Sequence, residues 1–267
     1  MTDEGKRNVL GVMVNAIDYA AVVSRVIEAA RERRPLGVTA LAVHGVISGY
    51  RDPEHGTRLN RLDVVVPDGQ PVRWALNFLH GADLPDRVYG PTLMLRLCAE
   101  AARLGLPIYL YGSTPEVLER LSRSLYLRFP TIQIAGSEPS KFRRLSEQEA
   151  AEVTDRIVTS GARITFVGLG CPRQEVWTYE YRESLSMPIL AVGAAFDFHA
   201  GTVRQAPRWM QDRGLEWLFR LKTNPRRLWR RYLLLNPWYV GLIIVQRVLP
   251  HRFVPSDSRN VRTISYG

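Results

Sequence analysis

Short runs rich in valine and isoleucine alternate with amphipathic stretches through most of this 267-residue chain. The runs predict strands over residues 9–14, 38–43, 63–66, 87–89, 108–111, 132–135, 164–167 and 189–192. The amphipathic stretches predict helices over residues 19–31, 72–79, 93–104, 116–128, 147–160 and 173–183. Strands separated by helices pair in parallel, because each helix supplies the crossover that a parallel pair needs. The sequence therefore predicts an α/β protein with a Rossmann-like, largely parallel sheet and helices on both faces.

Residues 206–252 depart from this alternation, because their pattern is helical throughout and rich in tryptophan and arginine. We expect three parts: an α/β domain over residues 1–205, a helical appendage over residues 206–252, and a loosely ordered tail over residues 253–267. Cys98 and Cys171 make no disulfide framework, and the N-terminus MTDEGKRNVL has no apolar signal segment. No apolar stretch reaches the roughly 20 residues of a membrane-spanning helix. These features predict a cytoplasmic protein.

Most of the net charge of +10 lies in the appendage. Eleven basic residues between Arg204 and Arg252 stand against only Asp212 and Glu216, which gives this region a local charge of +9. A neutral body with one basic region indicates an anionic partner, either a phospholipid surface or a nucleic acid. The charge lies beside apolar residues and comes with no RNA- or DNA-reading motif, so a membrane partner is favoured. A basic nucleic-acid-binding protein is the rival interpretation.

Three turns that follow predicted strands are candidates for ligand binding. The segments are YGSTPEVLERL with Gly112 and Ser113, VGLGCPRQEVW with Gly168, and AVGAAFDFHAG with Asp197. Small residues there leave the backbone N–H groups at the start of a helix open to a ligand. Ligands of open α/β sheets bind at the carboxyl ends of the strands, so we expect these turns to line one crevice. Ordinary loop chemistry is the alternative, since none of the turns is a GxGxxG or a phosphate-binding P-loop motif.

Asp68, in VVVPDGQPVRWA, is the candidate general base. It follows a run of valines and precedes a predicted helix, so its carboxylate is expected at the rim of the crevice, where it can accept a proton. An aspartate in an ordinary Asp-Gly turn is the alternative. The five histidines have no metal-ligand spacing and no two aspartates are two residues apart, so we expect neither a metal nor another cofactor. A departing diphosphate would then be neutralised by arginine.

Four arginines run directly into an apolar segment in NPRRLWRRYLLLNPWYVGLIIV, residues 224–245. On a helix that starts at Pro225, the four arginines share one side, and most of the aromatic and aliphatic residues lie opposite. Pro237 then begins a second segment that is apolar nearly all round. Such a pair is typical of helices that lie in the headgroup layer of an anionic membrane. The predicted docking residues are Arg226, Trp229, Arg231, Tyr232, Trp238 and Tyr239. The alternative is that both helices simply pack on the domain.

Several segments together resemble the WecG/TagA/CpsF glycosyltransferases, glycosyltransferase family 26. They are PDGQPVRWA, DRVYGPTLM, GLPIYLYGS, VGLGCPRQEVW, VGAAFDFHAGTVRQAPRWM and GLEWLFRLKTNPRRLWR, in the family's order within residues 9–232. The resemblance implies an inverting, metal-independent enzyme that moves a sugar, typically N-acetylmannosamine, from a UDP donor to a polyprenyl-diphosphate-linked acceptor. Such an enzyme works at the inner face of the plasma membrane, in the synthesis of exopolysaccharide or other cell-surface or teichoic-acid-type polymers. The acceptor sugar and the oligomeric state stay open, and a homo-oligomer is one option.

The resemblance also implies roles for individual residues. Asp68 matches the general base that deprotonates the acceptor hydroxyl. Donor-binding positions are matched by Arg87, Gln174 and Asp197. The turns with Gly112, Ser113 and Gly168 are included in the predicted substrate site. An arginine pattern that holds diphosphates is matched by Arg220, Arg227 and Arg230.

One position departs from the family's pattern. Members often carry Thr-x-Asn where the second strand ends, at residues that contact the donor sugar, but LAVHGV places Ala42 and His44 there. We therefore expect His44 at the donor sugar, and another UDP-hexose is an alternative to N-acetylmannosamine. A non-catalytic membrane adaptor is a further interpretation, which substitution of Asp68 would distinguish from an enzyme.

Overall fold

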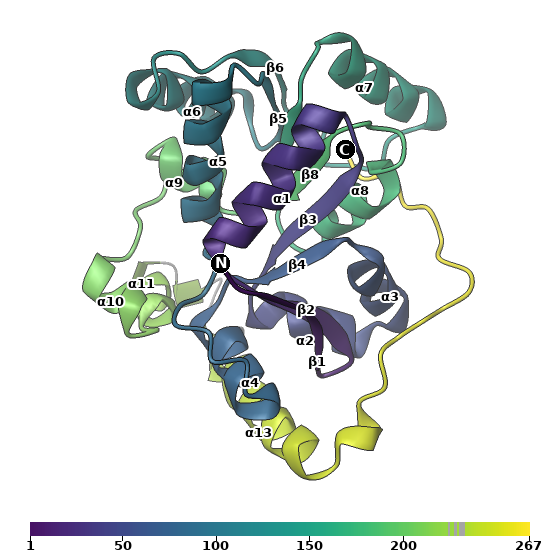
Figure 1. Ribbon diagram of the computed structural model, residues 1–267, viewed down its shortest axis with the longest axis vertical. Helices are drawn as coiled ribbons and strands as arrows, with labels where there is room; N and C mark the ends of the chain where they lie inside the picture. The colour runs from purple at the N-terminus through teal and green to yellow at the C-terminus, as the bar shows by residue number, and fades with distance from the viewer. Residues whose placement is uncertain (224, 227–228, 230–232) are drawn as a thin grey trace.

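A computed structural model of the chain describes residues 1–223, 225–226, 229 and 233–267. The strands are β1 (Asp3–Val9), β2 (Val12–Ile17), β3 (Leu36–Leu41), β4 (Val64–Pro67), β5 (Ile108–Gly112), β6 (Ile134–Glu138), β7 (Ile164–Gly168) and β8 (Pro188–Ala191). A six-stranded sheet has the order β4-β3-β8-β7-β5-β6, and every neighbouring pair in it is parallel. The predicted parallel α/β architecture is confirmed (Figure 1).

Helices cover both faces of this sheet (Figure 1). Those of the α/β domain are α1 (Tyr19–Glu32), α2 (Val43–Arg51), α3 (Pro53–Arg61), α4 (Gln70–His80), α5 (Gly90–Leu104), α6 (Pro115–Arg128), α7 (Glu147–Thr159), α8 (Arg173–Tyr181) and α9 (Ala195–His199). One core cluster joins α1, α5, α6 and α9 to Val64 and Val66 of β4. A second joins α7 and α8 to Val167 and Ile189, on the other face. Because both faces are covered, β4 is buried at every residue, which is why its sequence is a run of valines.

The N-terminal prediction of one strand over residues 9–14 is wrong. β1 and β2 form an antiparallel hairpin whose turn is Leu10 and Gly11, at φ values of 55° and 81°. A two-residue turn with positive φ at both positions matches the twist of the flanking strands. The hairpin lies beside β4, where the Val65 N–H donates to Asn15 Oδ1 at 2.9 Å.

Other predicted strands also differ from the structure. Residues 87–89 form no strand, because the Val88 N–H bonds only to Pro67 O and no strand edge continues the pairing. The strand predicted over residues 132–135 is shifted to β6, and the one over residues 38–43 ends at Leu41. Three helices of the α/β domain, α2, α3 and α9, were not predicted. The buried faces of α2 and α3 include glycine and polar residues, and α9 is only five residues long. The six predicted helices are all present, with ends moved by a few residues.

Most of the described residues between 206 and 252 are helical. The appendage contains α10 (Arg208–Asp212), α11 (Glu216–Thr223) and α13 (Leu235–Val248), followed by the 3-10 turn η1 (Pro250–Arg252). Tyr239 and Ile243 of α13 are buried in the core cluster that also holds residues of the hairpin and of α4. The Gln246 side chain accepts from the Leu10 N–H and donates to Asn8 O. α13 is therefore anchored to the α/β domain.

Residues 253–267 run back along the α/β domain in extended conformation (Figure 1, yellow). The N–H groups of Ile264 and Ser265 donate to the Glu180 carboxylate on α8. Farther along, the Leu145 N–H donates to Ser265 O, and Arg144 pairs with Tyr266 in an isolated bridge. No helix among residues 1–223, 225–226, 229 and 233–267 combines the length and apolar character that crossing a bilayer requires.

Candidate active site

The predicted site residues follow neighbouring strands and lie along one edge of the sheet. Asp68 follows β4, and His44 lies in the first turn of α2, directly after β3. Gly112 ends β5 and Gly168 ends β7, and the Ser113 N–H donates to Gly168 O at 3.1 Å. Gly112 has a φ of 113°, and a β-carbon there would lie 2.8 Å from Gly168 O, so no larger residue fits this turn. The carboxyl ends of the strands therefore form one crevice edge.

One pocket at this edge contains Asp68. Its volume is about 90 Å³, and its walls come from two parts of the chain. The α/β domain contributes Ala42, Val43, His44, Asp68, Gly69, Gln70, Pro71 and Arg87. The appendage contributes Gly214, Glu216, Trp217, Arg220, Leu235 and Asn236. The structure thus brings together four of the predicted site residues, and it places α11 over the general-base candidate.

The pocket wall carries a buried network centred on Glu216. The Glu216 carboxylate accepts hydrogen bonds from Arg87 Nη2 and from Tyr89 Oη, each at 2.9 Å, and it forms an ion pair with Arg220 Nη2 at 2.8 Å. Tyr89 Oη also accepts from Gln205 Nε2 at 3.1 Å. The Arg87 guanidinium lies over the Tyr89 ring, 4.2 Å from its centroid. Two cationic groups from different parts of the chain are therefore held beside one carboxylate.

The two acidic groups of the pocket have different electrostatic environments. Loss of solvent raises the pKa of the Asp68 carboxyl, although Arg87 and the hydrogen bond from the Gly90 N–H offset part of this effect. Burial would also raise the pKa of Glu216, but Arg220 and Arg87 together hold it below its usual range. Burial raises the pKa of Tyr89, which therefore stays protonated and donates to Glu216. Asp68 is therefore the pocket carboxylate whose proton affinity the surroundings increase, the property that a proton acceptor needs.

The remaining predicted residues lie along the same edge but outside this pocket. Gln174, in the first turn of α8, is buried and donates to Glu175 Oε1 at 3.0 Å. It lies next to Gly193, where an added β-carbon would be 3.5 Å from Gln174 Nε2. Asp197 of α9 is partly exposed and accepts from Thr202 Oγ1 at 3.3 Å. The edge is continuous, because the Gly90 backbone lies close to both Asp68 Oδ1 and Val192 O.

A known protein family matches almost the whole length of this arrangement. The sequence model of the glycosyl transferase WecG/TagA/CpsF family matches residues 7–252, which include the crevice edge and the appendage. The chain belongs to this glycosyltransferase family. A curated relative from Bacillus spizizenii is 31% identical over 195 residues, which are 73% of each chain. It is an N-acetylglucosaminyldiphosphoundecaprenol N-acetyl-β-D-mannosaminyltransferase.

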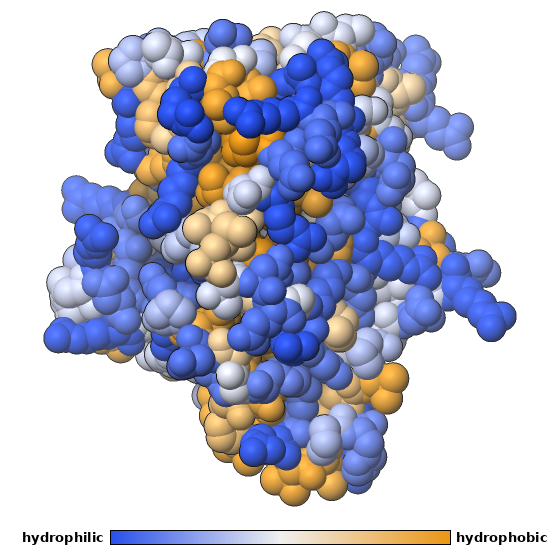
Figure 2. Space-filling view, viewed as in Figure 1, coloured by the Kyte–Doolittle hydropathy of each residue, from blue (hydrophilic) through white to orange (hydrophobic). Residues whose placement is uncertain are grey.

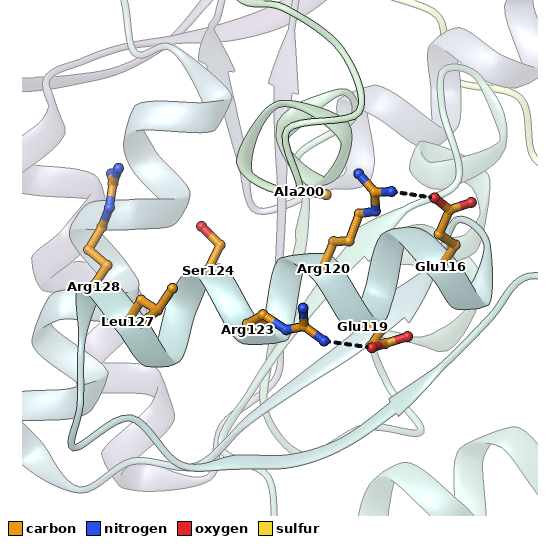
Figure 3. A pocket seen from close by; sticks show the side chains of 8 residues that line it. All are labelled: Glu116, Glu119, Arg120, Arg123, Ser124, Leu127, Arg128 and Ala200. Atoms are coloured by element: carbon orange, nitrogen blue, oxygen red, sulfur yellow. Dashed lines mark hydrogen bonds and ion pairs between the residues drawn. The ribbon is translucent and has the colours of Figure 1, made fainter.

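The glycosyltransferase has a larger hollow elsewhere, along α6 (Figure 3). Its volume is about 770 Å³, and charged side chains line it. Glu116 pairs with Arg120 and Glu119 with Arg123, each at 2.9 Å, along the exposed surface of one helix. Pairs four residues apart on an exposed helix stabilise that helix weakly. No residue of the Asp68 pocket lines this hollow, so size does not identify the site in this enzyme.

The sequence did not reveal two members of the Glu216 network. Glu216 and Tyr89 were not predicted as site residues, although Glu216 is one of only two acidic residues, with Asp212, inside a strongly basic region. Tyr239, predicted to dock on a membrane, is 2% exposed and donates to Pro71 O, so it cannot reach lipid. Some predictions lie outside the described residues: those for Arg227, Arg230, Arg231 and Tyr232. Within the described residues, no group of three or more His, Cys, Asp or Glu side chains could hold a metal ion.

Proposed function

We propose that this glycosyltransferase moves a sugar from a UDP donor to a polyprenyl-diphosphate-linked acceptor, with inversion and without a metal ion. The observation that carries the proposal is one pocket that contains a basic carboxylate, Asp68, and two guanidinium groups, those of Arg87 and Arg220. The Bacillus relative is named for a diphosphoundecaprenol-linked acceptor and an N-acetylmannosaminyl group, and we propose the same classes here.

The proposed reaction is a single displacement at the anomeric carbon of the donor sugar. The acceptor oxygen forms the new bond to that carbon while Asp68 takes the hydroxyl proton. The bond from the carbon to the diphosphate oxygen breaks, and UDP leaves with the electron pair. Arg87 and Arg220 stabilise the charge that develops on the diphosphate, in place of a divalent cation. The Glu216 carboxylate is already engaged by hydrogen bonds from Arg87 and Tyr89 and by the ion pair with Arg220, so Asp68 alone serves as the base. Direct attack then inverts the configuration.

Binding of the whole donor requires more space than the pocket has. Sites for ligands of this size have volumes of roughly 300–1,000 Å³, whereas the Asp68 pocket measures about 90 Å³. We propose that α11 moves when the donor enters. The nucleotide would then extend from Asp68 along the crevice edge toward Asp197, Gln174 and the turns with Gly112, Ser113 and Gly168. His44 would lie at the donor sugar.

A donor screen tests this function. We expect the enzyme to release UDP from UDP-N-acetylmannosamine or a related UDP-hexose, only with a lipid-diphosphate sugar acceptor, and at an unchanged rate in EDTA. UDP-sugars offered without the acceptor are the control. Loss of activity in EDTA that returns with Mg²⁺ would contradict the metal-independent mechanism, and no UDP release from any donor would contradict the proposed function.

The rate of transfer should depend on pH through Asp68. Only the ionised carboxylate accepts a proton, and its pKa is raised above that of a free aspartate. As pH falls, we therefore expect kcat/KM to decline at a higher pH than a free aspartate would cause, and to level off above the raised pKa. Initial rates of UDP release, measured from about pH 4 to about pH 9, test this dependence on pH. That range of ~5 units brackets the titration of a carboxyl group. A flat profile down to the usual aspartate range would contradict the role of Asp68.

We propose that the enzyme reaches its lipid-linked acceptor through an apolar outer face on α13 and α4, as a peripheral protein on the cytoplasmic side of the membrane. The exposed residues of this face are Trp74, Phe78, Trp238, Val240, Ile244, Val245 and Val248. Figure 2 shows hydrophobic residues gathered at the same end of the molecule. Arg247 lies over Phe78 and Arg51 over Trp238, which puts cations at the edge of the face. Trp229 and Arg226 of the basic segment are exposed as well.

Charged substitutions on this outer face should weaken membrane binding without unfolding the protein. We expect Ile244→Asp with Val248→Asp to lower binding to anionic liposomes more than ~10-fold, because each apolar side chain contributes ~1.5–3 kcal/mol on burial. Both side chains are exposed, so the core is untouched. Sedimentation with liposomes of ~30% anionic lipid measures binding. Val158→Asp, at an exposed position on α7, is the matched control. Equal binding by both proteins would exclude α13 as the docking face.

A further inference from the structure

Glu216 is an unusual residue for its surroundings. It is an acid in the most basic part of the chain, yet it is only 8% exposed and lies at the start of α11. Deprotonation of the acceptor hydroxyl is assigned to Asp68 and not to Glu216, and Glu216 was not among the site residues predicted from the sequence. Instead it accepts hydrogen bonds from Arg87 and Tyr89 and forms an ion pair with Arg220. Its charge must therefore act through these neighbours.

The two arginines reach the pocket from independent elements. Arg87 lies in the segment between α4 and α5, and Arg220 lies on α11, one helical turn after Glu216. Two guanidinium groups near one another repel in a site with little water. Glu216 accepts a hydrogen bond from Arg87 and forms an ion pair with Arg220, and so it sets the distance between the two guanidinium groups. A guanidinium has five N–H groups, so binding to Glu216 does not prevent the same side chain from binding phosphate oxygens.

Glu216 also joins α11 to the α/β domain. Its bond to Tyr89 Oη reaches the residue directly before α5, and Tyr89 is held in turn by Gln205. The side chains of Arg87 and Glu216 are 9% and 10% exposed, so their pair is largely shielded from solvent. Charge pairs with this little solvent are sensitive to the loss of one partner.

We propose that Glu216 is a positioning residue that sets the spacing and the net charge of the Arg87–Arg220 pair, and that it thereby tunes both the stabilisation and the release of the departing nucleoside diphosphate. This inference rests on the proposed function. With Glu216 ionised, the two arginines and the glutamate carry a net charge of +1. Without the carboxylate they carry +2, which attracts a diphosphate more strongly but leaves the two guanidiniums unaligned.

The proposal predicts opposite effects on binding and on turnover in Glu216→Gln. The Kd for UDP should fall ~3–10-fold, because one counter-charge is lost. kcat should fall ~10–100-fold, because the arginines no longer meet the leaving group in the required geometry. A merely structural role would weaken UDP binding and turnover together. Calorimetry with UDP and initial rates of UDP release measure the two quantities, and thermal denaturation shows that the variant folds.

Two further variants and a control make the test specific. In Glu216→Asp the charge remains but the carboxylate is retracted, so UDP affinity should return to the wild-type value while kcat stays reduced. In an Arg220→Met background, Glu216→Gln should change kcat by less than ~3-fold, because coupled residues are not additive. Glu54→Gln is the control, since Glu54 likewise pairs with an arginine four residues later, Arg58, far from the pocket.

Three results would overturn the role of Glu216. They are wild-type kcat in Glu216→Gln, wild-type kcat in Glu216→Asp, or parallel losses of UDP affinity and turnover in either variant. Wild-type enzyme that releases no UDP from any donor would instead refute the proposed function. The two failures are therefore distinguishable.

Discussion

Replacement of Asp68 by asparagine should nearly abolish sugar transfer and at the same time make the folded enzyme more stable at neutral pH. Asparagine cannot take a proton from the acceptor hydroxyl, and loss of a general base lowers kcat by roughly 10²–10⁴-fold. Asparagine can still accept the hydrogen bond that the Gly90 N–H gives to Asp68 Oδ1 at 2.6 Å. The local structure should therefore persist, and the Kd for UDP should change little.

The gain in stability follows from the direction of the pKa shift. The pKa of Asp68 is raised in the folded protein, so the folded state binds more protons than the unfolded state between the two pKa values. The free energy of unfolding consequently falls as pH rises through that window, and it stays lower above it. An asparagine side chain does not ionise, so this loss is absent from the Asp68→Asn variant at neutral pH. Below the unfolded pKa the difference should vanish.

Two measurements on Asp68→Asn check these expectations. Initial rates of UDP release report the loss of transfer, and thermal unfolding at acid and neutral pH reports stability. Asp257→Asn, at an exposed position in the tail, is the control. Asp63→Asn is less suitable, because Asp63 accepts a hydrogen bond from the Gly37 N–H at 2.6 Å. A lower midpoint of unfolding at neutral pH, or transfer within ~10-fold of wild type, would contradict the assignment of Asp68 as an ionisable base.

Replacement of Arg87 by glutamine should damage both activity and folding. Arg87 donates to Glu216 and lines the pocket with Asp68, so its loss removes one group proposed to stabilise the leaving diphosphate. Loss of one such group lowers kcat by roughly 10²–10³-fold. It also leaves a buried carboxylate with one fewer partner, for which a penalty of ~3 kcal/mol in the free energy of unfolding is expected. This estimate is at the low end because the ion pair with Arg220 and the hydrogen bond from Tyr89 still stabilise the Glu216 carboxylate.

Urea unfolding and UDP-release rates measure the two effects of Arg87→Gln. Arg61→Gln is the matched control, because Arg61 pairs with Asp257 at the same 2.9 Å but in an exposed position. Exposed pairs contribute about 0–1 kcal/mol, so the control should unfold near the wild-type midpoint and keep full activity. Equal stability of Arg87→Gln and Arg61→Gln would show that the Glu216 network does not support the fold.

The sequence predicted the architecture because strands that are buried on both faces have unbroken runs of apolar residues. The valines of β4 and the segment ITFVG of β7 can hardly be anything else. The same reasoning failed at residues 87–89, where Val88 and Tyr89 have strand-like side chains. The single bond from the Val88 N–H to Pro67 O of β4 does not continue into strand pairing. Side-chain type indicates a buried extended segment, whereas a strand also needs a partner, and a partner is a property of the tertiary structure.

Single residues of the site could be predicted from the sequence, but which residues lie together in one pocket could not. Local pattern placed Asp68 directly after a strand, as the structure has it, whereas His44, predicted at a strand end, lies in the first turn of α2; both line one pocket. Glu216 is 129 residues from Arg87 in the sequence, and no local pattern links the two residues. Tyr239 shows the converse limit, because an aromatic residue in an apolar helix packs equally well against lipid or against Pro71 of its own chain.

The appendage is fixed to the α/β domain on both sides of α11. Upstream, Ala206 is buried, and downstream α13 contributes Tyr239 and Ile243 to the core. A backbone cut engineered between Thr223 and Leu235 should therefore yield two fragments that stay together through gel filtration. The helix that carries Arg220, α11, is therefore held to the α/β domain by the segments before and after it. An enzyme molecule bound to a bilayer through α13 would accordingly keep its Asp68 pocket at a fixed distance from the lipid headgroups.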